Sequence, residues 1–258
     1  MLSRIKWLTF LSLDAPLVAV AWQALFSRES ENDLSWYHYL IVFMSVWLGY
    51  AADRWFDNRK SNRPRSEQHQ FLARHSRFVQ IIWIPVLLAD VILAFSKLTA
   101  GELTRGFALM AASLAYTFFA QRCRHIPGYP LLKSLLTAFL IMASATLFLP
   151  AESISQTSTL LCLVAIWLLF ASNCLFIRAW TRESEPRSGR LAHLLAIGSA
   201  LISVIVFWTP MKLVGAAAVI ALVGIVSLNV LRIRVPNQPR RTLADICLLS
   251  PLLVILLT

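Results

Sequence analysis

Apolar and polar positions follow one another along this chain in long blocks rather than in a residue-by-residue alternation. Each apolar block is about 20 residues long or somewhat shorter, which is the length of a membrane-crossing helix, and continuous hydrophobicity excludes a closed β-barrel. We therefore predict a single all-α transmembrane domain over residues 1–258. The nine expected spans are residues 8–26, 38–52, 78–97, 104–120, 132–149, 158–178, 191–208, 213–231 and 243–257.

The first, second and ninth spans differ from the others. The second and ninth are short, so we expect them to tilt or to continue beyond the lipid as amphipathic helix. The first follows Arg4 and Lys6 and contains Ala19-Val20-Ala21, a sequence similar to a signal-peptide cleavage site. Because its apolar run continues to Phe26, a retained helix is the favoured interpretation.

Composition and charge agree with a membrane protein. Apolar residues make up 58% of the chain and charged residues only 14%, which is outside the usual balance of a soluble domain. Of the 24 basic residues, 20 precede the first span or follow an even-numbered one, so we expect a cytoplasmic N-terminus and an external C-terminus, most naturally in a bacterial inner membrane. The net charge of +11 therefore reflects topology and lipid contact rather than nucleic-acid binding.

The segment Gly49-Tyr50-Ala51-Ala52-Asp53-Arg54-Trp55-Phe56-Asp57 stands where the second span gives way to a basic loop. If the helix continues through it, Asp53 and Asp57 share one face, with Cβ atoms about 5–6 Å apart. Carboxylates at that spacing bind Mg²⁺ ions that also hold a diphosphate. The segment thus predicts a metal and phosphate site at the membrane surface.

Nine spans, with acidic residues after the second and sixth, resemble the UbiA superfamily of intramembrane prenyltransferases over essentially the whole chain. Asp53 and Asp57 match the latter half of that family's first motif, NDxxDxxxD, whereas Gly49 and Tyr50 replace its Asn and first Asp. Its second acidic motif is expected after the sixth span, where this chain has only Glu183-Ser184-Glu185 before Pro186. Glu183 and Glu185 are the candidates for a second, weaker Mg²⁺ site.

The resemblance implies a bundle around a central cavity that opens toward the cytoplasm. It also implies Mg²⁺-assisted transfer of an isoprenyl group from an isoprenyl diphosphate to a lipophilic acceptor. Arg122 and Lys133 match basic residues that contact the diphosphate in the family. Four further candidates for diphosphate binding are Arg54, Arg59, Arg178 and Arg182. For each basic residue the alternative role is topology or lipid contact.

Other polar and aromatic residues near the cytoplasmic ends of spans are candidates for the same cavity. A charge at the bilayer centre costs about 2.5–3.5 kcal/mol, so Asp14 and Asp245 each need a partner or a function. Both are candidate catalytic residues that accept the acceptor's proton. Alternatively, Asp14 caps or kinks its helix and Asp245 pairs with Arg241. The remaining cavity candidates are Tyr50, Trp55, Phe56, Asn173 and Asn229.

Trp55 and Phe56 have a second possible role, and Asp90 lies away from the predicted cavity. Trp55 and Phe56 could stabilise positive charge on the ionised prenyl carbon. Asp90 lies toward the external half of the third span, where a packing hydrogen bond or a link to Lys97 is expected.

The missing acidic positions also support a different class of protein. This alternative is a noncatalytic membrane protein that keeps the fold and binds an isoprenoid or lipid. A small-solute transporter is a distant third hypothesis, because the chain shows no convincing internal repeat or pair of broken helices.

Overall fold

The computed structural model describes residues 11–59, 76–123, 128–181, 186–231 and 237–258, without the side chains of residues 56–59, 76–80, 130, 186 and 238. Within these ranges the regular structure is helical and no strand occurs, which confirms the all-α prediction. The helices are α2 (Asp14–Glu29), α3 (Trp36–Arg59), α5 (Ser76–Lys97), α6 (Ala100–Arg122), α7 (Tyr129–Ala145), α8 (Ala151–Ile154), α9 (Thr157–Thr181), α10 (Pro186–Val206), α11 (Lys212–Val230), α12 (Asn237–Cys247) and α13 (Ser250–Leu257).

Four helices in the described part of the chain, α6, α9, α10 and α11, are long and apolar enough to cross a membrane. Helix α7 contributes a shorter apolar segment, Leu131–Ala145. These features are those of an all-helical membrane protein. Every predicted span overlaps a helix or a pair of helices, but α2 has only 16 residues, and nine membrane crossings remain a prediction.

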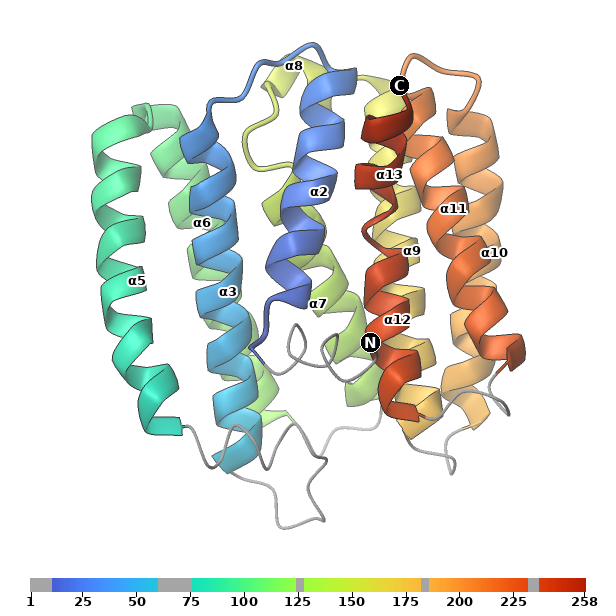
Figure 1. Cartoon of the computed structure of the whole chain (residues 1–258), viewed down its shortest axis with the longest axis horizontal. Helices are drawn as coiled ribbons and strands as arrows, with labels where there is room; N and C mark the ends of the chain where they lie inside the picture. The colour runs from blue at the N-terminus through green and yellow to red at the C-terminus, as the bar shows by residue number, and fades with distance from the viewer. Residues whose placement is uncertain (1–10, 60–75, 124–127, 182–185, 232–236) are drawn as a thin grey trace.

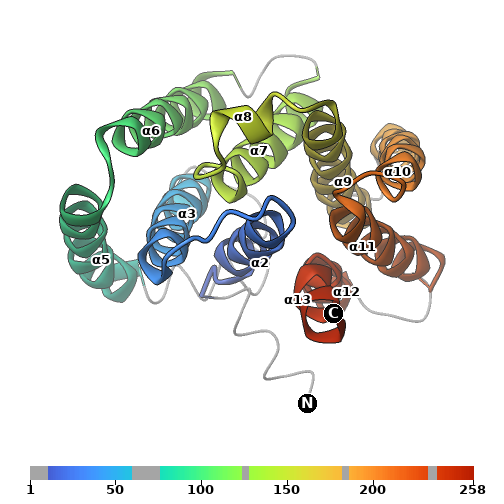
Figure 2. The ribbon, with the colours of Figure 1, turned by 90° about the horizontal axis from the view of Figure 1, so that it is seen from above.

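The long helices run alternately up and down (Figure 1). The ends of α3, α6, α9 and α11 lie at the same end of the bundle as the beginnings of α5, α7, α10 and α12 (Figure 1). We call this the basic end, because these helix ends and the sequence segments that join them contain most of the basic residues. Viewed from above, α5 and α6 form an outer arc, whereas α2, α7, α9, α11 and α13 surround the centre (Figure 2).

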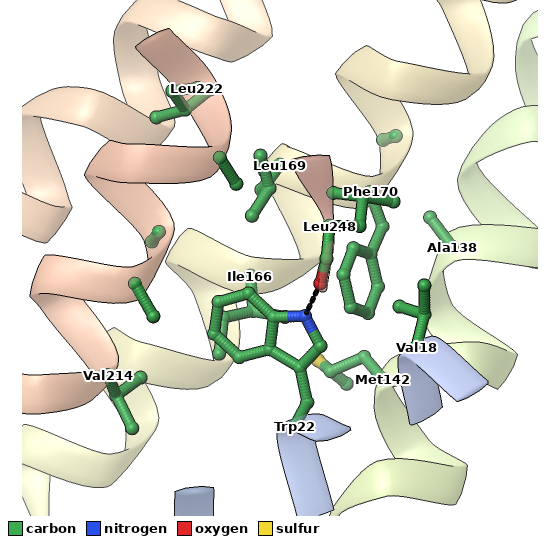
Figure 3. Packing of buried hydrophobic residues seen from close by; sticks show 14 of the residues in the cluster. Val18, Trp22, Ala138, Met142, Ile166, Leu169, Phe170, Val214, Leu222 and Leu248 are labelled. Carbon is green, nitrogen blue, oxygen red and sulfur yellow. Dashed lines mark hydrogen bonds between the residues drawn. The ribbon is translucent and has the colours of Figure 1, made fainter. Parts of the chain in front are cut away.

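Trp22 of α2 occupies the centre of the hydrophobic core (Figure 3). Its side chain is fully buried, and its ring packs edge-on against Phe170 of α9 with ring centroids 5.8 Å apart. The indole N–H donates a hydrogen bond of 2.9 Å to the carbonyl of Leu248 (Figure 3). This contact ties α2 to the segment between α12 and α13.

The predicted ninth span, 243–257, is not one continuous helix. Helix α12 ends at Cys247, and α13 begins at Ser250. Pro251 explains the break, because proline has no amide hydrogen for the preceding turn and its ring collides with the carbonyl four residues earlier. The indole of Trp22 satisfies the Leu248 carbonyl at this break.

In the first predicted span, 8–26, residues 8–10 lie outside the described ranges, and α2 begins at Asp14. Ser12, which lies shortly before this helix, has a left-handed backbone with φ of 60°. Ala19 and Ala21 of the possible cleavage site are both buried within α2. This helix forms part of the core.

Helix α11 packs very closely against its neighbours. A Cβ atom added at Gly215 would lie 2.8 Å from the carbonyl oxygen of Ser203 in α10, and one at Gly224 would lie 2.6 Å from Cys247 Sγ in α12. Small residues at such positions allow helices to approach closely in membranes. At the start of α11, Glu29 Oε2 accepts hydrogen bonds from the amides of Leu213 and Val214, at 2.8 and 3.4 Å.

Candidate functional site

Helix α3 carries the predicted acidic motif and continues through it to Arg59. The condition for Asp53 and Asp57 to share one helix face is therefore met. The side chain of Asp57 lies outside the described part of the structure, as do those of Phe56 and Arg59. Residues Arg182, Glu183 and Glu185 lie outside it altogether, so convergence of the two acidic motifs stays a prediction.

Arg54 is buried and bound within the protein rather than directed to solvent. Its Nη2 donates to both oxygens of Asp14, at 3.1 and 3.5 Å, and to the hydroxyl of Tyr50 at 2.7 Å. Its Nη1 donates to Ser12 Oγ at 3.2 Å, and its guanidinium carbon lies 4.1 Å from the centre of the Tyr50 ring. Arg54 thus holds the start of α2 against α3.

Asp53 forms an ion pair with Lys133 of α7. Lys133 Nζ lies 3.3 Å from one carboxylate oxygen of Asp53 and 3.4 Å from the other. The predicted metal ligand and the predicted diphosphate ligand are therefore neighbours in space, although 80 residues separate them in the sequence. In this arrangement the ammonium group neutralises the carboxylate.

Asp245 of α12 belongs to the same region. Asn173 of α9 is buried and donates from Nδ2 to Asp245 Oδ1 at 3.2 Å. Asp245 also interacts electrostatically with Asp14 and Arg54, and with Arg241 of its own helix. The structure thus places Asp14 and Asp245 near each other, and their role as residues of one cavity stays a prediction. We call the group of Asp14, Tyr50, Asp53, Arg54, Lys133, Asn173 and Asp245 the polar cluster.

Asn229, another predicted cavity residue, takes part in a separate network that joins α9, α10 and α11. Trp180 Nε1 donates to Asn229 Oδ1 at 2.9 Å, and Asn229 Nδ2 donates to His193 Nε2 at 3.1 Å. His193 Nδ1 donates to the carbonyl of Gly189 at 2.7 Å, which fixes the ring nitrogen that accepts. Arg240 lies over the Trp180 ring, 5.3 Å from its centre.

The remaining predicted residues are more scattered. Arg122 is exposed and lies over the ring of Phe118, with 5.4 Å between its guanidinium carbon and the ring centre. Trp55 and Arg178 are half-buried. Asp90 accepts a hydrogen bond of 2.7 Å from Ser45 Oγ, which confirms the expected packing contact.

Sequence reasoning missed Ser12, Trp180 and His193 as polar partners. Ser12 and His193 are single polar residues without a motif, and the sequence offered no signal for their roles. Trp180 lies near the end of a predicted span, where an aromatic residue is typical of the membrane interface and does not indicate a hydrogen-bond partner. In the structure Trp180 is buried and hydrogen-bonded to Asn229.

Comparisons of the chain with protein-family models, with curated proteins and with solved structures found no match.

Proposed function

We propose that this protein is a UbiA-like intramembrane prenyltransferase with nine spans, which transfers an isoprenyl group from an isoprenyl diphosphate to a lipophilic acceptor. The observation that carries the proposal is the polar cluster, to which α2, α3, α7, α9 and α12 each contribute. Ionisable groups inside a membrane domain are costly, and their gathering at one depth is typical of a substrate or ion site. The basic end would then face the cytoplasm of a bacterial inner membrane.

The proposed Mg²⁺ site requires ligands from side chains that the structure does not describe. The described residues contain no group of three or more His, Cys, Asp or Glu side chains that could hold a metal ion. Asp53 would need Asp57, and also Glu183 or Glu185, to complete a set of oxygen ligands. When bound, Mg²⁺ would neutralise the diphosphate and stabilise its negative charge as it leaves.

The chain's own cations have a definable role in this proposal. Lys133 can exchange its contact with Asp53 for oxygens of a diphosphate, because an ammonium group forms short charge-assisted hydrogen bonds to phosphate. Arg54 keeps its contacts to Asp14 and Tyr50, and it supplies positive charge near the diphosphate without direct contact. Cleavage of the allylic C–O bond would leave the electron pair on the diphosphate, and the acceptor would attack the allylic carbon.

The ion pairs also favour a second candidate, a noncatalytic protein that binds an isoprenoid or an anionic lipid. Lys133 already neutralises Asp53, and Arg54 already neutralises Asp14. Such a site could bind a lipid phosphate through Lys133 alone. The two candidates differ in their need for Mg²⁺ and in turnover.

The experiment is release of diphosphate from a panel of isoprenyl diphosphates by the purified protein in nanodiscs, with and without Mg²⁺, with host lipid extract as acceptor. We expect Mg²⁺-dependent release that Asp53→Ala and Asp57→Ala both abolish. Asp90→Asn, which changes a buried carboxylate bound to Ser45 in another part of the bundle, is the matched control and should leave release unchanged. Binding of an isoprenyl diphosphate without release of diphosphate would identify the noncatalytic protein. Absence of both binding and release would refute the two candidates.

A further inference from the structure

The polar cluster contains one buried side-chain oxygen that lacks a hydrogen-bond donor. The Asn173 side chain is only 3% exposed, and its Oδ1 has no hydrogen-bond partner. Asp245 is half-buried and accepts the Asn173 amide on Oδ1, and no hydrogen bond within the described part of the chain occupies its Oδ2. An ionised carboxylate and an amide oxygen only accept hydrogen bonds, and buried acceptors are normally satisfied. The pair is therefore complementary to a group that donates.

Asp14 differs from Asp245 in this respect. Arg54 Nη2 contacts both oxygens of Asp14, and Ser12 and Tyr50 surround the same guanidinium. Asp14 thus serves as the counter-ion that keeps Arg54 buried. Asp245 is the carboxylate of the two that has an oxygen available for a ligand.

We propose that Asp245 and Asn173 bind the acceptor substrate, that this acceptor is a lipid with a hydroxyl group, and that Asp245 takes the hydroxyl proton. The inference rests on the proposed function and adds the acceptor's chemical class to it. The hydroxyl donates to Asp245 Oδ2, and a second donor on the acceptor or a bound water satisfies Asn173 Oδ1. Asn173 also orients the carboxylate through the 3.2 Å hydrogen bond to Asp245 Oδ1.

The reaction balances without a further reagent. The allylic C–O bond to the diphosphate breaks, and its electron pair leaves with the diphosphate. The acceptor oxygen forms a new C–O bond to the allylic carbon, and its proton moves to Asp245 Oδ2. Release of that proton to water regenerates the carboxylate, so the products are an ether, diphosphate and a proton.

The test uses the full chain in nanodiscs with a labelled isoprenyl diphosphate and either nonylphenol or its methyl ether, which lacks the O–H group. Ether product and released diphosphate are measured separately. We expect product only with nonylphenol, and a loss of about 100-fold or more in product formation for Asp245→Asn, as for loss of a general base. Asn173→Leu should raise the KM for nonylphenol about tenfold, the effect of one lost hydrogen bond, with a smaller change in kcat.

Asp245→Asn and Asn173→Leu should give the wild-type circular-dichroism spectrum and elute as the wild type does in size-exclusion chromatography, which shows that both variants are folded. The matched control, Asp90→Asn, should form product as the wild type does. Equal product formation by wild type and Asp245→Asn would overturn the inference and leave the proposed function standing. Diphosphate release by the wild type without product from nonylphenol would also overturn it.

A binding measurement separates this inference from failure of the proposed function. If the wild type releases no diphosphate at all, the enzymatic proposal fails. Thermal unfolding then tests whether Asp245 and Asn173 bind a hydroxyl group. Nonylphenol should raise the Tm of the wild type more than its methyl ether does, and Asp245→Asn should remove the difference. Equal Tm shifts for the two compounds in the wild type would overturn the hydroxyl-binding site as well.

Discussion

Arg54 and Asp14 form a buried ion pair whose value lies mainly in mutual neutralisation. Removal of one partner leaves an uncompensated buried charge, which typically costs about 3–5 kcal/mol, whereas removal of both costs much less. We therefore expect Arg54→Leu to lower the free energy of unfolding by that amount, and Arg54→Leu with Asp14→Leu to recover a large part of it. Denaturant titration in detergent measures both. Additive losses in the double variant would show that the two side chains are not coupled.

Gln23 of α2 is fully buried, and neither its amide nitrogen nor its amide oxygen has a hydrogen-bond partner. An unpaired buried polar group costs about 1–3 kcal/mol, and an apolar group of similar shape avoids that cost. We expect Gln23→Leu to raise the free energy of unfolding by about 1–2 kcal/mol, measured by the same titration. Gln23→Ala, which removes volume as well, should not stabilise. A loss of stability in Gln23→Leu would mean that a bound water or ligand satisfies the amide.

The polar partners illustrate what the sequence could and could not predict about the site. Asp53 and Lys133 were both selected from the sequence, and the structure brings them together. Arg54 was predicted as a diphosphate ligand from its place in the motif, but Asp14 contacts it from 40 positions away in the sequence. Hydropathy and motif spacing describe single helices, so they cannot show which charge of one helix neutralises which charge of another.

The contact between α11 and α12 depends on a glycine. A Cβ atom at Gly224 would lie 2.6 Å from Cys247 Sγ, whereas one at Gly198 would lie at an ordinary 3.4 Å from the flexible Leu168 side chain. Alanine is favoured over glycine within a helix by about 1 kcal/mol, so the two positions should respond in opposite directions. We expect Gly224→Ala to destabilise the protein and Gly198→Ala to be neutral or stabilising in thermal unfolding. Cys247→Ala should partly rescue Gly224→Ala, and failure of that rescue would locate the strain elsewhere.

The presence of each helix was easier to predict from the sequence than whether that helix is continuous. Continuous apolar blocks predicted the helices, because each block must satisfy its backbone internally. The break between α12 and α13 was not predicted, since membrane helices tolerate proline where a neighbour supplies a hydrogen bond. Here that neighbour is Trp22, whose indole reaches the Leu248 carbonyl from 226 positions earlier in the sequence. Such compensation becomes visible only after the helices are packed.

The two ends of the bundle differ in charge, and this asymmetry bears on orientation. Helices α3, α6, α9 and α11 end at the basic end (Figure 1), and in the sequence a segment that contains arginine follows each of them. Exposed acidic residues such as Glu31 and Glu152 lie in connections at the opposite end, between α2 and α3 and in the short helix α8. Positively charged loops are retained in the cytoplasm, so the basic end is expected to face it.

Labelling of single cysteines tests this orientation in cells. In a variant without the four native cysteines, Glu31→Cys and Glu152→Cys should react with a membrane-impermeant maleimide added to spheroplasts. Arg122→Cys and Arg187→Cys, exposed positions at the basic end, should react only after permeabilisation. The reverse pattern would place the polar cluster at the external side, away from cytoplasmic diphosphates, and would count against the prenyltransferase. The expected pattern would put Asp53, Lys133 and Asp245 within reach of an isoprenyl diphosphate made in the cytoplasm, as the proposed reaction requires.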